Sequence, residues 1–140
     1  MILLDTNILS AMMLPQPDEA VTSWLNRQAS EDVWTTTISV FEVRLRLALL
    51  DQGRRRRLLE EAFQVLTENL LYGRIATFDV ASAEFAADVA AKRRLAGRTG
   101  EFRDTQIAGI ALARRASVAT RNVRHFGDLG VPILNPWSTG

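Results

Sequence analysis

Three acidic residues occupy positions at which a parallel sheet would present its chemistry. Asp5 directly follows the apolar run at the N-terminus, and Glu42 lies in the first turn of the helix expected after a second strand. Asp104 lies at the polar beginning of a later helix. Because ligands of open α/β sheets bind outside the carboxyl ends of the strands, we expect these three carboxylates to meet at one edge of the sheet.

Carboxylates held close together repel one another and raise one another's pKa, so a cluster of three requires a cation. Mg²⁺ and Mn²⁺ are the natural choice, since such hard ions bind carboxylate, carbonyl and water oxygens and share their coordination with substrate phosphates. A bound ion of this kind lowers the pKa of a water molecule and neutralises charge at a phosphate. We therefore predict metal-assisted hydrolysis of a phosphodiester, with Asp5, Glu42 and Asp104 as metal ligands and catalytic residues.

The composition excludes other common kinds of catalytic or metal site. The chain has no cysteine and a single histidine, His125, so it has no disulfide framework, no thiolate zinc site and no multi-histidine site. A Cys-His pair is excluded as well, no Ser-His-Asp arrangement competes, and no G-x-x-x-x-G-K-[ST] phosphate loop occurs. Any bound metal ion must therefore be held by oxygen.

The acidic positions also have purely structural interpretations. Asp5 or Thr6 could simply cap the helix that follows, since both residue types are good N-caps. Ser39 and Glu42 have the spacing of a capping box, in which the Glu side chain turns back to the N-cap amide. Both interpretations stay open at this point. Asp79 precedes an Ala-rich helix and most simply caps it, so we leave it out of the catalytic set.

The elements that position these acids follow from the apolar and β-forming runs. The run Met1–Leu4 is continuous rather than alternating, which suits a central parallel strand covered on both faces. The 140 residues and 47% hydrophobic content favour one α/β domain spanning residues 1–140, without internal repeats or low-complexity segments. Further strands are predicted at 33–37, 74–78, 117–120 and 132–134. Helices are predicted at 7–13, from Pro17 onward, and at 39–50, 52–72, 81–95 and 101–113.

The charge balance gives no global reason to expect a nucleic-acid partner. There are 17 basic and 16 acidic residues, for a formal net charge of +1. Every Lys or Arg residue except Lys92 is an arginine. The planar guanidinium group of arginine binds phosphate through two parallel hydrogen bonds, which a lysine ammonium group cannot form. The cluster Arg54–Arg57 spreads around a helix, so a solvated or partner-facing surface is its default interpretation and an RNA groove is secondary. The other candidates for contact with an RNA backbone are Arg44, Arg46 and Arg103.

The sequence gives no reason to expect a membrane protein. No apolar run approaches the length of a membrane span. The N-terminus carries no basic leader, and only a few apolar residues precede Asp5. We therefore expect a soluble, cytoplasmic protein.

Five short stretches occur in an order and spacing typical of one known family: LLDTN, SVFEVRLRLALL, DTQIAGIALARR, TRNVRHF and NPW. Together they resemble the PIN domain, and specifically the VapC toxins of bacterial toxin–antitoxin pairs in their FitB-like branch. No single stretch is decisive, but the five together make the resemblance specific. It covers essentially the whole chain, from Met1 to Trp137.

This resemblance implies a three-layer α/β/α sandwich on a mostly parallel sheet and a ribonuclease that depends on Mg²⁺ or Mn²⁺. It also implies a homodimeric toxin with a cognate VapB-type antitoxin. In such pairs the antitoxin usually blocks the active site with a C-terminal segment, and the complex binds its operator DNA through the antitoxin. The RNA substrate would be recognised by its shape and its single-stranded bases more than by its sequence.

The family's functional residues carry over only where the motifs match. Asp5, Glu42 and Asp104 match the acidic metal-binding triad. Thr6 matches a position whose hydroxyl helps to order the site. Asn122 falls where many PIN domains have a fourth acid, and we place it with the catalytic residues. The residues expected to support the site are Thr6, Asn7, Glu101 and Thr120.

The chain also departs from the family pattern near the site. Asn122 carries no charge, so any second metal ion would be held more weakly and through water. His125 stands where relatives often carry Asp, which removes another acid from the neighbourhood. Glu101 stands where a small polar residue is commoner, and we hypothesise that it partly replaces the missing charge.

Two other functions compete with the nuclease. Phosphatases of the haloacid dehalogenase type also use an Asp at the end of the first strand, as a nucleophile. Their pattern requires a second Asp two residues later, where this chain has Asn7. The other alternative is a PIN-like module that has lost catalysis and only binds an antitoxin or RNA. The intact set of Asp5, Glu42 and Asp104 argues against that alternative.

Overall fold

The computed structural model describes residues 1–98 and 100–138. Within them, five parallel strands form one sheet in the order β3-β2-β1-β4-β5. β1 lies at the centre, where Ile2 pairs with Val33 on one side and with Ser117 on the other. The predicted parallel α/β sheet is therefore confirmed. The strands are β1 (Ile2–Leu4), β2 (Val33–Thr36), β3 (Ile75–Ala76), β4 (Ser117–Ala119) and β5 (Ile133–Leu134).

Helices connect the strands in the predicted order, with one short helix at Val123–Phe126 that is not predicted. A 3₁₀ turn at Ser30–Asp32 precedes β2, and a π-helical turn at Leu66–Leu70 continues the fourth helix. The α-helices of the described residues are α1 (Thr6–Met12), α2 (Glu19–Asn26), α3 (Thr37–Leu49), α4 (Arg54–Val65), α5 (Val80–Leu95), α6 (Phe102–Arg114) and α7 (Val123–Phe126).

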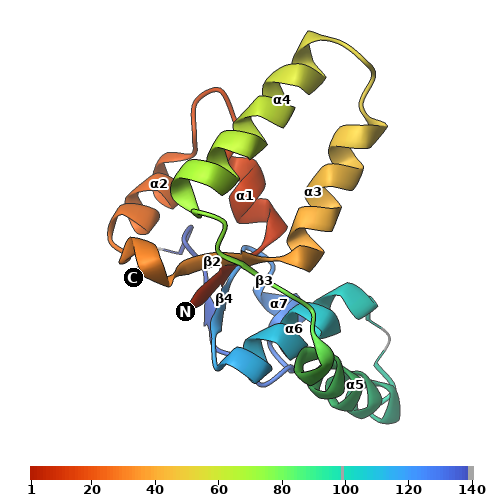
Figure 1. Ribbon diagram of the computed structural model, residues 1–140. Coiled ribbons are helices and arrows are strands. Elements are labelled where there is room, and N and C mark those ends of the chain that lie inside the picture. Colours follow the sequence, from red (N-terminus) through yellow and green to blue (C-terminus); the bar gives the residue numbers. More distant parts are fainter. Residues whose placement is uncertain (99, 139–140) are drawn as a thin grey trace.

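Both faces of the sheet are covered, because successive side chains of β1 point to opposite faces. Leu4 packs into a core with α1 to α4, and Leu3 packs into a second core with α6. Figure 1 shows α1 to α4 on one side of the strands and α5 and α6 on the other. This is the three-layer α/β/α sandwich that the family resemblance implies. Fully buried members of the two cores include Ile8, Leu9, Val21 and Phe63 in the first and Ile107, Ile110, Val118 and Phe126 in the second.

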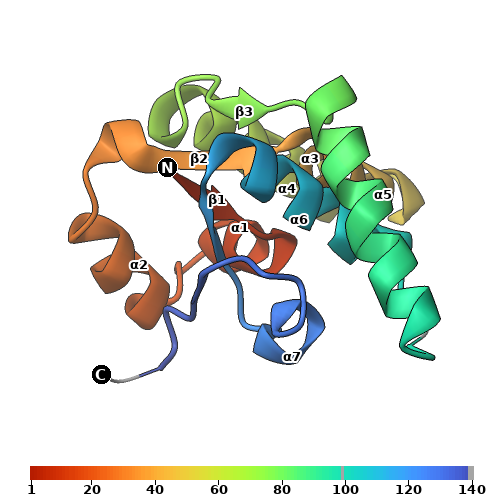
Figure 2. The ribbon, with the colours of Figure 1, turned by 90° about the horizontal axis from the view of Figure 1, so that it is seen from below.

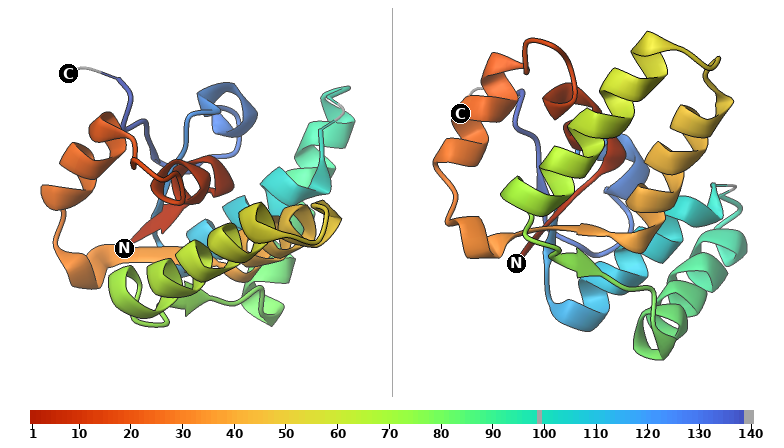
Figure 3. Two further views of the ribbon diagram at one scale, coloured as in Figure 1. Left: turned by 90° about the horizontal axis from the view of Figure 1, so that it is seen from above. Right: turned by 45° about the horizontal axis from the view of Figure 1, so that its top comes forward.

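Two pairs of helices dominate the covering layers. Figure 3 shows α3 and α4 side by side, joined at the ends remote from the sheet by the short loop 50–53. On the other face α5 packs on the outer side of α6, as Figure 2 shows. The first pair carries Glu42 on α3, and the second carries Asp104 on α6.

Gly109 explains how closely α5 and α6 approach. A Cβ atom at this position would lie 2.3 Å from the carbonyl oxygen of Ser82 and 2.7 Å from the Cβ of Ala86. Such distances are far below van der Waals contact, so any larger residue would push the helices apart. Because α6 also carries Asp104, this close contact helps to set where that carboxylate lies.

Several predicted boundaries differ from the structure. The helix predicted from Pro17 begins at Glu19, because Asp18 is the N-cap and its side chain accepts from the amides two and three residues later. The strand predicted over 74–78 is only Ile75–Ala76, since the chain turns where the Asp79 amide donates to the Thr77 carbonyl. The helix predicted over 52–72 begins at Arg54. Asp79 caps α5 as predicted, its side chain accepting from the amide of Ser82.

Candidate functional site

The structure brings Asp5, Glu42 and Asp104 together around the guanidinium group of Arg103. The Nη1 atom of Arg103 lies 2.8 Å from Asp104 Oδ1. Its Nη2 atom pairs with Asp5 Oδ1, and its Nε atom pairs with Glu42 Oε1. Asp5 comes from the end of β1, Glu42 from α3 after β2, and Asp104 from α6 before β4. The three acids therefore converge from three separate elements of the fold, as the sequence predicts.

The cluster is largely shielded from solvent. The side chains of Asp5 and Asp104 are 0% and 6% exposed, and those of Arg103 and Glu42 are 18% and 20% exposed. Charges that are removed from water must be paired, because desolvation disfavours the charged form. Arg103 supplies that pairing for all three acids.

Burial and charge act in opposite directions on the pKa values of this cluster. Burial alone would lower the pKa of Arg103, but the charges and hydrogen bonds of Asp5 and Glu42 outweigh it and raise the pKa. Burial raises the pKa of Asp104, and the hydrogen bond and charge of Arg103 offset only part of that rise. The arginine is therefore firmly protonated, and the surroundings of Asp104 disfavour its ionised form.

A cation of the chain itself lies among the three carboxylates. We expect three clustered carboxylates to require a cation, and here the chain supplies that cation itself through Arg103. Among residues 1–98 and 100–138, no group of three His, Cys, Asp or Glu side chains is arranged to hold a metal ion.

The donor set nevertheless suits a hard divalent ion. Three carboxylates on separate elements offer oxygen ligands of the kind that Mg²⁺ and Mn²⁺ prefer. They face one guanidinium group, so the cluster carries two negative charges in excess. The residues therefore fit such an ion chemically, and Arg103 contacts all three of the acids that would hold it.

Two threonines hold the Asp5 carboxylate in position. Its Oδ1 atom accepts from the Thr6 amide at 2.7 Å, and its Oδ2 atom accepts from the Thr120 hydroxyl at 2.7 Å. The Thr6 hydroxyl donates to Glu42 Oε1 at 2.7 Å. Asp5 is thus the N-cap of α1, as the structural interpretation has it, and also a member of the acidic cluster. The two interpretations of this residue are compatible.

Thr120 is itself fixed by neighbouring polar groups. Its Oγ1 atom accepts from the Asn7 side chain at 3.2 Å and from the Asn122 amide at 3.0 Å. The Asn7 side-chain oxygen accepts from the Arg121 amide at 3.1 Å. Asn7 and Thr120 therefore support Asp5 through hydrogen bonds. Asn122 joins this network through its backbone, and its side chain is exposed.

The capping box expected at Glu42 is wrong. Helix α3 begins at Thr37, and its N-cap is Thr36, whose Oγ1 atom accepts from the Ser39 amide at 3.1 Å. The reason is that Thr36 ends β2 in an extended conformation, so the helix starts directly after the strand. Glu42 then lies in the second turn, where its side chain reaches the acidic cluster instead of the N-cap.

Two further residues border the site. His125 Nδ1 lies 3.5 Å from Asp104 Oδ2, and the histidine side chain is 56% exposed. Glu101 is the exposed N-cap residue of α6, and its side chain makes no capping hydrogen bond. The suggestion that Glu101 replaces a missing charge stays a prediction. His125, a departure from the family pattern, lies in α7, which follows β4 within the stretch TRNVRHF.

The arginines proposed for RNA contact have different surroundings. Arg46 lies 3.6 Å from Glu42 at the rim of the cluster and is 63% exposed. Arg44 stacks over the ring of Phe63 at 5.0 Å. Within the arginine run of α4, Arg56 pairs with Glu60 at 2.7 Å. Arg46 is therefore the exposed arginine of this set that adjoins the acids, whereas Arg103 lies among them.

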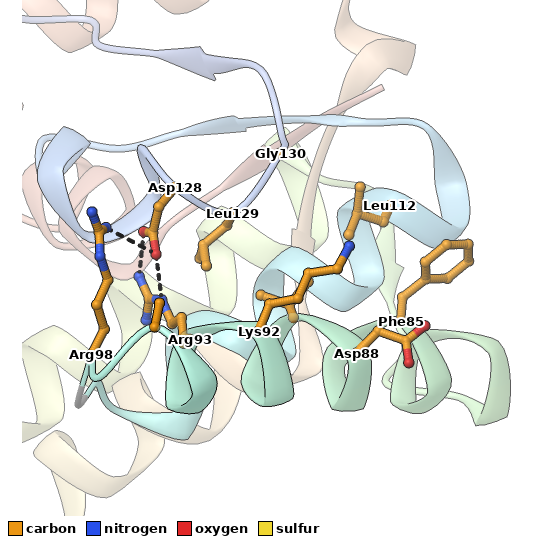
Figure 4. Close-up of a pocket in the computed structure, with 11 residues that line it drawn as sticks. Phe85, Asp88, Lys92, Arg93, Arg98, Leu112, Asp128, Leu129 and Gly130 are labelled. Carbon is orange, nitrogen blue, oxygen red and sulfur yellow. Dashed lines mark hydrogen bonds and ion pairs between the residues drawn. The ribbon is translucent and has the colours of Figure 1, made fainter.

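Two hollows lie on the α5 and α7 side of the molecule. One of about 550 Å³ is bordered by α5 and the loop before β5, and in it Asp128 pairs with Arg93 and Arg98 (Figure 4). The other, of about 470 Å³, adjoins Asp104 and is lined by Arg124 and His125 among others. Only the second touches the acidic cluster.

No helix of the described residues is long and apolar enough to cross a membrane.

Comparison with known proteins places these features in a family context. The family model for the PIN domain matches residues 2–131. The chain is 34% identical to the VapC ribonuclease Y4jK of Sinorhizobium fredii over 137 residues, which are 98% of this chain and 98% of that protein. It is 37% identical to the toxin FitB of Neisseria gonorrhoeae, over 98% of this chain and 99% of that one.

A solved structure shares the fold. One chain in the structure of FitAB bound to an IR36 DNA fragment superposes with a TM-score of 0.89 and 36% identity. The match covers 100% of this chain and 98% of that chain. The similarity therefore extends over both layers of helices and the whole sheet.

Proposed function

We propose that this chain, which belongs to the PIN domain family, is a metal-dependent endoribonuclease toxin of a toxin–antitoxin pair. The observation that carries the proposal is the convergence of Asp5, Glu42 and Asp104 on one cation within a PIN fold. Supporting it are two similar proteins, a VapC ribonuclease and the toxin FitB. We treat residues 1–140 as one PIN domain.

The three acids would hold one divalent ion, Mg²⁺ or Mn²⁺, which when bound supplies an activated water and neutralises charge at the phosphodiester. The remaining contributions come from the chain. Thr6 and Thr120 fix the two oxygens of Asp5, so this carboxylate keeps one orientation. Asn7 and the Asn122 amide hold Thr120 in turn. Hydrogen bonds of this kind to a metal-binding side chain orient that side chain and tune its basicity.

The partners follow from the same family context. A solved relative consists of FitAB bound to a DNA fragment. We propose that this chain likewise pairs with a VapB-type antitoxin, forms a homodimer, and meets operator DNA only through that antitoxin. RNA is the proposed substrate. Arg46 at the rim of the cluster is the proposed contact with the RNA backbone, because its exposed guanidinium lies beside Glu42.

Controlled expression in bacteria tests the proposed toxin activity. The wild-type chain should arrest growth and leave fragmented cellular RNA, while Asp5→Asn and Asp104→Asn at equal protein levels should do neither. Asp79→Asn is the matched control, since that carboxylate caps α5 away from the cluster and Asn is also a good N-cap. Growth arrest with intact RNA, or arrest by both site variants, would contradict the proposal.

The phosphatase alternative loses its support. The chain belongs to the PIN domain family, and Asn7, which stands where the second Asp of such phosphatases would be, donates to Thr120. The expression experiment also distinguishes a nuclease from the inert binding module, because only a nuclease fragments cellular RNA. A chain that binds an antitoxin but neither arrests growth nor fragments RNA would favour that module.

A further inference from the structure

Arg103 has an unusual place for an arginine in the first turn of a helix. Its three guanidinium nitrogens each contact a different carboxylate, of Asp5, Glu42 and Asp104. Nη2 also lies 3.3 Å from the Thr6 hydroxyl. The side chain is 18% exposed and points among the acids rather than into solvent. A positive group of this chain therefore occupies the centre of its own candidate site.

We propose that Arg103 is an internal cation that competes with the divalent metal ion for Asp5, Glu42 and Asp104. The arginine holds the acids together without an ion, and the ion binds only when the guanidinium group leaves. Arg103 is thus a positioning residue that sets the ion affinity. This inference rests on the proposed metal site.

The hydrogen bonds show why the two cations exclude one another. Asp5 Oδ1 accepts from Arg103 and the Thr6 amide, and Asp5 Oδ2 accepts from Thr120. Glu42 Oε1 accepts from Arg103 and the Thr6 hydroxyl. The threonine donors are a backbone amide and buried hydroxyls, so they are fixed. Arg103 is the remaining donor to Asp5 Oδ1 and Glu42 Oε1, and it reaches them through a long side chain.

A guanidinium group and a divalent ion that shared these three carboxylates would also repel one another. Like charges a few ångströms apart in a partly dry site disfavour one another strongly. Arg103 has a route to solvent, because its side chain is long and 18% exposed and the two preceding residues, Glu101 and Phe102, are exposed. Exchange also improves the charge balance. Three carboxylates facing one guanidinium leave an excess of two negative charges, and a divalent ion reduces that excess to one.

The energetic consequence is a reduced apparent affinity for the ion. When only a fraction of molecules has the binding-competent arrangement, the apparent Kd rises by the inverse of that fraction. If Arg103 is inserted in about nine of ten metal-free molecules or more, its removal should tighten Mn²⁺ binding by about tenfold or more. It should also remove the pairing that the acids have in the absence of metal, which lowers the Tm measured in EDTA.

Isothermal titration with Mn²⁺ and thermal unfolding test this inference without any activity measurement. The variants are Arg103→Gln and Arg103→Lys, with Arg46→Gln as the matched control. Arg46 also adjoins Glu42, at 3.6 Å, but is 63% exposed at the rim, so its removal reports the general effect of losing one positive charge. Asp5→Asn shows whether the titrated ion binds at the acidic cluster.

The expected result is that Arg103→Gln tightens Mn²⁺ binding far more than Arg46→Gln does, with a lower Tm in EDTA and a larger rise on adding Mn²⁺. Arg103→Lys, which keeps the charge but loses the fork, should fall between the wild type and Arg103→Gln. If Arg103→Gln does not fold without metal, the Mn²⁺ affinity of Arg103→Lys tests the competition instead. Unchanged affinity in Arg103→Lys would then overturn the inference.

Other outcomes separate this inference from the proposed function. Equal Mn²⁺ affinity in wild type, Arg103→Gln and Arg46→Gln, lost in Asp5→Asn, would overturn the competition and leave the metal site standing. Binding by Arg103→Gln when the wild type binds nothing would support the competition in its strongest form. No Mn²⁺ binding by any variant would overturn both.

Discussion

The Thr120 hydroxyl donates to Asp5 Oδ2 at 2.7 Å, so a residue that follows β4 fixes the carboxylate that follows β1. These two strands are adjacent and parallel in the sheet. Their register therefore sets the orientation of one member of the acidic cluster. The pairing of β1 with β4 therefore determines how the Asp5 carboxylate is oriented in the site.

Replacing Thr120 by Val should disturb both stability and activity. The change removes a donor to Asp5 and leaves the donors from Asn7 and the Asn122 amide without their acceptor. A buried polar group that loses its partner costs about 1–3 kcal/mol, so we expect the free energy of unfolding to fall by about 2 kcal/mol. Urea unfolding measures this loss, and RNA cleavage by the folded variant should fall about tenfold.

Thr120→Ser is the control for this change, because it keeps the hydroxyl and removes only a methyl group. It should retain most of the stability and cleavage of the wild type. If Thr120→Ser loses as much as Thr120→Val, the hydroxyl is not the feature that orders Asp5.

Gly109→Ala should be strongly destabilising although it adds a single methyl group. The new Cβ would lie 2.3 Å from the Ser82 carbonyl oxygen on α5. Overpacking of this kind costs about 1–3 kcal/mol and sometimes more. Thermal or urea unfolding gives the value. Gly127→Ala is the matched control, because its Cβ would meet the Val123 carbonyl at an ordinary 3.6 Å. Equal stabilities of the two variants would show that α5 and α6 have room to separate.

The ion pair between Arg93 and Asp128 predicts a pH-dependent part of the stability. The hydrogen bond from Arg93 lowers the pKa of Asp128 below its usual value of 3.8. A carboxylate whose pKa is lower in the folded state stabilises the fold at pH values above its unfolded pKa, and this contribution disappears as the pH falls through the folded pKa. The contribution should therefore be complete at pH 6 and vanish well below pH 4.

Asp128→Asn should be less stable than the wild type by up to about 1 kcal/mol at neutral pH, because solvent screens this partly exposed pair. Arg93 is only 10% exposed in this pair and would lose its charged partner. The difference between variant and wild type should shrink as the pH falls toward 3, when urea unfolding is followed across this range. A difference that stays constant from pH 7 to pH 3 would assign the effect to packing instead of charge.

The sequence predicts the convergence of the acids because parallel strands end at one edge. Asp5 and Asp104 are placed by the apolar runs beside them, and those runs also define β1 and α6. The position of Arg103 does not follow from the same pattern. Neighbouring positions on a helix lie about 100° apart, so Arg103 and Asp104 share the site only because the long arginine side chain bends back among the acids.

The start of α3 shows the limit of local motifs. Ser39 and Glu42 have the spacing of a capping box, yet the hydroxyl of Thr36 caps the helix because β2 ends there. A tertiary contact, the pairing of Glu42 with Thr6, then competes for the carboxylate. Similarly, only the structure shows that Gly109 on α6 meets α5.

The most direct test of the central claim is cleavage of total RNA and tRNA by the purified, antitoxin-free protein. The reactions contain Mg²⁺, Mn²⁺ or EDTA, with Asp5→Asn and Asp104→Asn beside the wild type and Asp79→Asn as the control. We predict cleavage by wild type and Asp79→Asn with either ion, none in EDTA, and none by the two site variants. Cleavage that persists in EDTA, or in folded Asp5→Asn and Asp104→Asn protein, would contradict a carboxylate-held metal site.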